Sequence, residues 1–221
     1  IALLRQTYMD GTWYENGGME VEKNISLEAW NEIKDMPVIF EVRDKQEAMR
    51  AQKIANEFDR TYVIMGSGDE YQRLEEMKAM NTAFILPVKF PDAYDVEDPF
   101  DANLASLGDM KHWEMASGNA ARLTAEDIDI ALTTHGLKKK SDFMGAVRKA
   151  IESGLSEEEA LRALTYTPAQ LTGAEDMLGS LEAGKVANFL ITSGPIFNKG
   201  TTIHHNWVGG KPNVLKELDA V

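Results

Sequence analysis

The sequence contains no cysteine, which excludes disulfide bonds and thiolate metal sites. This absence is compatible with either an oxidising or a reducing compartment, so the localisation stays open. No apolar run approaches the roughly 18 residues that a membrane-spanning helix needs, and the chain shows no basic-then-apolar leader. We therefore expect a soluble chain. Because it starts at Ile1 rather than at methionine, we also expect it to be a segment of a longer gene product.

Basic residues are scarce relative to acidic ones. The chain has 23 Lys and Arg against 36 Asp and Glu, which gives a formal net charge of −13. Nucleic acid and anionic membrane surfaces both require a basic face on the protein, so neither is expected as a partner. The 43% of hydrophobic and 27% of charged residues are ordinary for a globular protein, and 221 residues suffice for one domain with a small appendage.

What the chain does contain is an alternation of short apolar runs with amphipathic segments. The runs predict strands at residues 38–42, 62–65, 83–87 and 128–133. Strands separated by single helices are typical of parallel crossovers in an α/β fold. Four such units make half of an eightfold β/α barrel, and four strands cannot close that barrel.

Local signals predict where the helices begin and end. Ser26 is expected to cap a helix over residues 27–34, and Asp44 a longer helix that runs to about Phe58. Further helices are expected at residues 70–80 and 142–153.

The most informative stretch lies near the end of the chain, at residues 164–191. Just before it, Ser156 and Glu159 have the spacing of a capping box. Within it, Thr167 followed by Pro168 is typical of a cap with proline at the first helical position. Gly173 can take the left-handed conformation that ends a helix. Turns are expected at 179–184, and strands at 186–192 and 201–208, the latter followed by the punctuation Gly209-Gly210-Lys211-Pro212.

This stretch resembles the closing signature of the amidohydrolase superfamily, in which a helix with a T-x-N/T-P-A box precedes LGSLE-x-GK-x-AD and two hydrophobic residues. The matching residues are Thr165, Thr167, Pro168, Ala169, Gly173, Leu178, Gly179, Ser180, Leu181, Glu182, Gly184, Lys185 and Ala187. The chain is similar to imidazolonepropionase-like, metal-dependent hydrolases over nearly its whole length. The resemblance implies that residues 1–175 form strands five to eight of a TIM barrel and that residues 176–221 belong to a composite β-sandwich.

The resemblance also implies a metal site at the ends of the barrel strands. A family enzyme holds one or two divalent metals, zinc or similar, through a His-x-His on the first strand, histidines after the fifth and sixth, and an aspartate after the eighth. The metal that these ligands hold activates water for attack on a C–N or ester carbon. Here Glu41, Gly66 and His135 occupy the three positions that fall within the chain. No cofactor is therefore predicted for this chain, and the most economical interpretation is a catalytically degenerate segment, a pseudo-enzyme.

Two alternative sites remain open at these strand ends. Glu41 and His135, together with Asp69 or Glu70 in a possible pocket, could form a weak replacement metal site. The turn Gly66-Ser67-Gly68 could offer backbone N–H groups to an anion, although the two acidic residues after it favour an ordinary tight turn.

Other chemistry-bearing residues carry weaker signals. His204 and His205 are expected on opposite faces of a strand, so they cannot bind one ion together. The lysines 138–140 are predicted to be a solvated approach to a helix, and Ser117 lacks the glycines of a nucleophile elbow. The connection 87–124, about 37 residues long, is expected to be either a lid or pocket wall or a surface excursion. Phe90, Phe100 and Trp113 would pack that excursion.

Two hypotheses for function follow. In the first, the parent protein hydrolyses a C–N bond in a cyclic amide, imidazolone or peptide-like substrate, and this segment supplies the second half of its barrel. In the second, the segment is a non-catalytic scaffold or interaction module paired with an active amidohydrolase domain. The exposed strand edges of an incomplete barrel imply a partner in both cases, either the N-terminal half of the same barrel or a second such domain.

Overall fold

Four parallel strands form the central sheet of the computed structural model, which describes residues 1–34 and 36–217. They are β1 (Val38–Glu41), β2 (Tyr62–Met65), β3 (Phe84–Pro87) and β4 (Ile130–Thr133), and they pair in the order β1-β2-β3-β4. The predicted strands and the mixed α/β class are confirmed. The parallel order places all four carboxyl ends at the same edge of the sheet.

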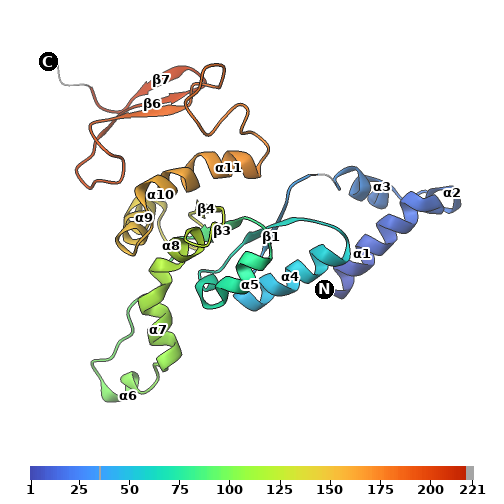
Figure 1. Cartoon of the computed structure of the whole chain (residues 1–221), viewed down its shortest axis with the longest axis horizontal. Coiled ribbons are helices and arrows are strands. Elements are labelled where there is room, and N and C mark those ends of the chain that lie inside the picture. The colour runs from blue at the N-terminus through green and yellow to red at the C-terminus, as the bar shows by residue number, and fades with distance from the viewer. Residues whose placement is uncertain (35, 218–221) are drawn as a thin grey trace.

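The two faces of this sheet are covered differently. Residues that face the helices are fully buried, among them Ile64, Phe84 and Leu86, and they belong to one continuous hydrophobic core. On the other face, Val63 and Ile85 are only half-buried, and Ile39 is 53% exposed. The helices between and around the strands are α1 (Ala2–Trp13), α2 (Met19–Val21), α3 (Ile25–Glu32), α4 (Lys45–Glu57), α5 (Leu74–Ala79), α8 (Asn119–Thr124), α9 (Phe143–Glu152), α10 (Glu157–Leu164) and α11 (Tyr166–Leu171) (Figure 1).

The helix caps agree with the sequence in part. Asp44 caps α4 by accepting hydrogen bonds from the backbone N–H groups of Gln46 and Glu47, as predicted. The predicted Ser26 cap is wrong, because the side chain of Asn24 accepts from the N–H groups of Ser26 and Leu27 and so starts α3 two residues earlier.

The segment predicted as one helix over residues 70–80 is divided. It begins as a 3₁₀ helix, Glu70–Arg73, and becomes the α-helix α5 only at Leu74. The side chain of Glu70 turns back onto the preceding loop, as described below, and this tight local geometry precedes the regular helix.

The two short helices near the end of the chain are α10 and α11. Ser156 caps α10 by accepting from the N–H of Glu159. The predicted Thr167 cap is wrong, because the residue at the N-cap of α11 is Thr165, with the non-helical angles φ −129° and ψ −76°. Pro168 is therefore the third residue of α11 rather than the first. Gly173 has φ +65° and follows the end of α11, as predicted.

A second, antiparallel sheet follows, with the order β5-β6-β7. Its strands are β5 (Phe189–Thr192), β6 (Ile203–Val208) and β7 (Lys211–Val214), and the sheet lies beyond α10 and α11 from the parallel strands (Figure 1). Strand β6 ends at Val208, as predicted, and Gly209 and Gly210, both with positive φ, form a tight turn that leads directly into β7. Strand β7 is missed by the sequence, since its short KPNV run is mostly polar and contains proline.

The long connection after β3 contains α6 (Pro99–Ala102) and α7 (Leu107–Met115), which extend away from the rest of the chain (Figure 1). Phe100 is 83% exposed and Trp113 is 43% exposed. The expectation that these two rings pack the excursion is therefore wrong, and only Phe90 packs against the core. No helix among the described residues is long and apolar enough to pass through a bilayer.

Candidate functional site

The three positions singled out by the sequence lie at the carboxyl edge of the parallel sheet. Glu41 is the last residue of β1, Gly66 directly follows β2, and His135 stands two residues after β4. In parallel α/β proteins, ligands and substrates bind at this edge. The fold therefore brings the three positions to the place where a site is expected.

Glu41 and His135 come from the two outer strands of the sheet, yet their side chains meet. The Nε2 of His135 lies 3.6 Å from Oε1 of Glu41, and both side chains are more than half exposed. In a flat sheet, three strand spacings of about 4.8 Å would hold the two backbones roughly 14 Å apart. Their meeting indicates that the sheet curls toward its less covered face. An exposed pair at this distance contributes little to stability.

Gly66 cannot carry a side chain in this structure. A Cβ atom at Gly66 would lie 2.3 Å from Oε1 of Glu70 and 2.9 Å from its carboxyl carbon. The space that a histidine would need is thus occupied by the carboxylate of Glu70.

The carboxylate of Glu70 is fully buried and is held entirely by neutral donors. The backbone N–H of Ser67 donates to Oε1 at 2.6 Å, that of Gly68 donates to Oε2 at 3.0 Å, and Nδ2 of Asn119 donates to Oε2 at 2.7 Å. The turn 66–68 does offer its N–H groups to an anion, but the anion is the chain's own glutamate. Because the N–H groups of Ser67 and Gly68 already donate to Glu70, they are not free for an external anion. The segment is therefore an ordinary tight turn rather than an external anion site.

Asp69 is engaged in the same way by a neighbouring helix. Its carboxylate accepts hydrogen bonds from the backbone N–H and the Nζ of Lys45, both within 2.9 Å, and from the hydroxyl of Ser67. Lys45 is the first residue of α4, so Asp69 ties the turn after β2 to the start of that helix. The carboxylates of Asp69 and Glu70 are therefore both engaged in hydrogen bonds within the chain.

The residues present do not fit a divalent metal. Zinc sites in proteins use three or four nitrogen, sulfur or carboxylate ligands. Glu41 and His135 supply two, and the nearby acidic side chains are committed to hydrogen bonds. Among residues 1–34 and 36–217, no group of three or more His, Asp or Glu side chains is arranged to hold an ion.

Asn119 is a site residue that the sequence did not reveal. Its Nδ2 donates to Glu70, and its Oδ1 accepts from the backbone N–H of Tyr71 at 2.8 Å. Asn119 opens α8, some 50 residues further along the chain, so it joins the end of the long excursion to the turn after β2. No local pattern marks it, because its partners are distant in the sequence.

The remaining candidates make no contact with these residues among the described hydrogen bonds and ion pairs. His204 is buried and its Nδ1 faces the carbonyl groups of Lys216 and Glu217, whereas His205 is on the opposite face of β6. Lys138 is exposed and pairs with Asp92 at 3.4 Å. Ser117 accepts a hydrogen bond from the hydroxyl of Ser153, and no histidine contacts it among the described hydrogen bonds.

The signature residues of the closing stretch form a compact structural unit. The Cβ that Gly179 lacks would lie 2.9 Å from Cβ of Ala169 and 3.0 Å from Cα of Tyr166, so this glycine lets the turn pack directly on α11. Lys185 donates to the hydroxyl of Ser180, which in turn donates to Glu182. These bonds lower the pKa of the Glu182 carboxyl, chiefly through the Ser180 hydroxyl and then through Lys185. The motif holds a turn together and contributes no group to the strand ends.

The fold and the position of the candidate site define the class: an α/β protein with a parallel sheet whose carboxyl edge carries the residues that would do chemistry. Residues 115–215 match the family model described as the amidohydrolase family. In sequence, this part of the chain is similar to the amidohydrolase family, and the chain as a whole shares the fold of a solved amidohydrolase.

The solved structures similar to the chain include an amidohydrolase from Thermotoga maritima MSB8, with a TM-score of 0.75 and 20% identity over 96% of this chain and 54% of that one. A second amidohydrolase matches with a TM-score of 0.60 and 15% identity over 85% of this chain and 46% of that one. Phenylurea hydrolase B matches with a TM-score of 0.51 and 17% identity, covering 80% of this chain and 43% of that one. No curated protein matches the sequence. The chain spans about half the length of the structures it resembles.

Proposed function

We propose that this chain is the second half of an amidohydrolase-type β/α barrel, in a protein whose family hydrolyses C–N bonds, and that this half is a scaffold without a metal centre of its own. The observation that carries the proposal is the contact between Glu70 and Gly66. The carboxylate of Glu70 fills the place where the family resemblance puts a ligand, and neutral donors hold it there.

The proposal includes a partner that completes both sheets. Within residues 1–34 and 36–217, strands β1 and β4 each pair on one side only, and Ile39 on the less covered face of β1 is 53% exposed. In the antiparallel sheet, β5 is also an edge strand, and a groove of about 730 Å³ runs between its residues Phe189 and Leu190 and Leu161 of α10. Exposed apolar strand edges of this kind pair with further strands. The N-terminal half of the same barrel, or a second amidohydrolase domain, would supply them.

Metal analysis of the purified chain tests the scaffold proposal. The protein is incubated with zinc, freed of excess metal, and measured by inductively coupled plasma mass spectrometry. We expect retained zinc far below one equivalent, with no difference between the chain and a Glu41→Ala, His135→Ala double variant. One equivalent of zinc that disappears in the double variant would contradict the proposal.

One observation favours a second candidate, a rebuilt site around Glu41 and His135. These two side chains approach to 3.6 Å at the edge where family chemistry takes place. With a third ligand from the completing partner they would bind a metal weakly. The same metal measurement, repeated on the longer protein that contains both halves, separates this candidate from a scaffold.

A further inference from the structure

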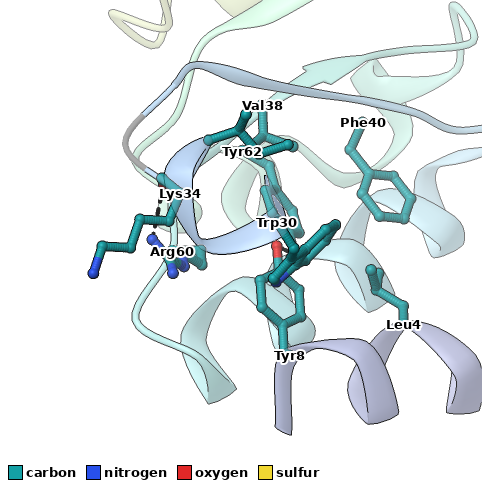
Figure 2. A pocket seen from close by; sticks show the side chains of 9 residues that line it. Leu4, Tyr8, Trp30, Lys34, Val38, Phe40, Arg60 and Tyr62 are labelled. Atoms are coloured by element: carbon teal, nitrogen blue, oxygen red, sulfur yellow. Dashed lines mark hydrogen bonds between the residues drawn. The ribbon is translucent and has the colours of Figure 1, made fainter. Parts of the chain in front are cut away.

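A small cavity lies at the opposite end of the first two strands. It has a volume of about 190 Å³ and is enclosed by α1, α3 and the start of β1 and β2 (Figure 2). Val38 begins β1 and Tyr62 begins β2, whereas the candidate site residues Glu41 and Gly66 are at the other ends of these strands. The cavity is thus separate from the carboxyl edge of the sheet.

Four of the nine residues that line the cavity are aromatic. Tyr8 meets Trp30 edge to face, with ring centroids 5.2 Å apart, and Phe40 stacks on Tyr62 at the same distance. Tyr8 and Tyr62 are only 7% and 1% exposed, so the surrounding core fixes their rings. Rigid aromatic walls of this kind accept a flat apolar ring at little cost in conformational entropy.

One buried donor beside the cavity lacks an acceptor, and a pair of hydroxyls has one hydrogen to spare. The Nε of Arg60 is buried and has no hydrogen-bond partner among the described residues, although its Nη1 donates to the carbonyl of Lys34. The hydroxyls of Tyr8 and Tyr62 are 2.8 Å apart, and this contact uses only one of their two hydrogens. Burial raises the pKa of Tyr62, so its hydroxyl stays protonated at neutral pH. Buried donors are normally satisfied, so the Nε of Arg60 is available to an acceptor beyond the described residues.

The charge and the size of the cavity narrow the class of ligand. No carboxylate of the described residues forms an ion pair with Arg60, whose guanidinium lies 5.9 Å from the ring centroid of Tyr8. Within the described part of the chain the guanidinium has no anionic partner, and an anionic ligand would supply one. A cavity of about 150 Å³ accommodates benzene, so this one has room for a single six-membered ring with a small substituent. Nucleotides and long acyl chains are too large.

We propose that this cavity binds a small aromatic monocarboxylate, with its ring against Tyr8, Trp30 and Phe40 and its carboxylate facing Arg60. The tyrosine hydroxyl pair supplies a second polar contact. The site gives the chain a ligand-binding role that is independent of chemistry at the strand ends.

Isothermal titration of the full chain with benzoate tests the proposal, with benzamide as the neutral analogue of the same shape. We expect benzoate to bind and benzamide to bind on the order of tenfold more weakly, because the charge-assisted hydrogen bond to Arg60 is lost. Arg60→Gln should weaken benzoate binding by a similar factor. Arg50→Gln, an exposed change on α4, is the matched control and should leave binding unchanged.

A cavity-filling variant keeps the test decisive if Arg60→Gln fails to fold. Leu4→Phe places extra atoms in the cavity and should abolish benzoate binding without lowering the thermal midpoint. The proposal is overturned if benzoate does not bind at millimolar concentration, if benzamide binds equally well, or if Leu4→Phe still binds. Binding in this chain that disappears in the longer protein would assign the cavity to the interface with the completing partner, and would also overturn it.

Discussion

Gly66 and Glu70 stand four residues apart, and their contact determines what the end of β2 can hold. We expect Gly66→Ala to lower the free energy of unfolding by about 1–3 kcal/mol, since the new methyl group would overlap the Glu70 carboxylate. The carboxylate could move only by leaving its buried hydrogen bonds to Ser67, Gly68 and Asn119. Chemical denaturation of the two proteins measures the difference.

A double-mutant cycle shows whether Glu70 is the cause. In a Glu70→Ala background, Gly66→Ala should cost less than about 0.5 kcal/mol, because the overlap is gone. Gly145→Ala is the control: this glycine lies in α9 with nothing within 4 Å of its missing Cβ, and the change should be neutral or stabilising. If Gly66→Ala lowered the free energy of unfolding equally in both backgrounds, Glu70 would not be the cause.

The pair formed by Arg43 and Glu47 provides a second test at this scale. Hydrogen bonds from the Arg43 side chain and backbone lower the pKa of the Glu47 carboxyl from its ordinary 4.5 to about 2. Because the pKa is lower in the folded state, the stability that this pair adds is complete above pH 4.5 and is lost as the pH falls toward 2. Carboxyl NMR should find Glu47 titrating near pH 2, and Arg43→Gln should return it toward 4.5. A titration near 4.5 in the unmodified chain would show that the pair does not form in solution.

Among the elements, the turn after α11 gives the closing signature a physical meaning. Gly179 has φ +92°, and the Cβ it lacks would lie within 3.1 Å of Ala169, Tyr166 and Thr165. Gly179→Ala should therefore destabilise the chain by roughly 2–4 kcal/mol, from overpacking and backbone strain together. Gly173, with φ +65° and no atom near its missing Cβ, is the matched control. Gly173→Ala should cost only about 1 kcal/mol, and similar thermal shifts for the two variants would contradict the packing argument.

The strands and long helices could be predicted because local patterns specify them. The apolar runs around Ile64 and Phe84 have strand length, and Asp44 is both a good cap and followed by helical spacing. The N-cap of α3 is Asn24 rather than the expected Ser26. Both residue types are good caps, they stand two positions apart, and hydrophobic periodicity does not distinguish them. The 3₁₀ start of the segment at Glu70 depends on tertiary contacts, which a local pattern does not contain.

The candidate site could be predicted in position but not in its chemistry. The sequence placed Glu41, Gly66 and His135 at strand ends, and the parallel order brings them to one edge. Glu70 was expected at the start of a helix and in a possible pocket, whereas its buried hydrogen bond is made with Asn119 at a sequence distance of 49 residues. The boundary predicted between residues 175 and 176, and the role of the long excursion as a lid or a surface feature, remain predictions.

At the scale of the whole molecule, the curl of the parallel sheet and its two open edges belong together. The contact between Glu41 and His135 across the four strands is consistent with outer strands that bend toward one another, and the less covered face carries the exposed Ile39. A curved sheet with an apolar concave face is shaped to enclose further strands. The chain's likeness to about half of each solved amidohydrolase is consistent with this shape.

Hydrogen exchange on the isolated chain tests whether these edges are open. β1 and β4 are each paired on one side, whereas β2 and β3 are paired on both. Local opening therefore needs fewer broken contacts at the outer strands, and their amides should exchange at least about tenfold faster than those of the inner strands. Mass spectrometry of peptides covering each strand gives the comparison. Equal protection of all four strands, together with a dimer in sedimentation experiments, would mean that a second copy of the chain already occupies the edges that we assign to the completing partner.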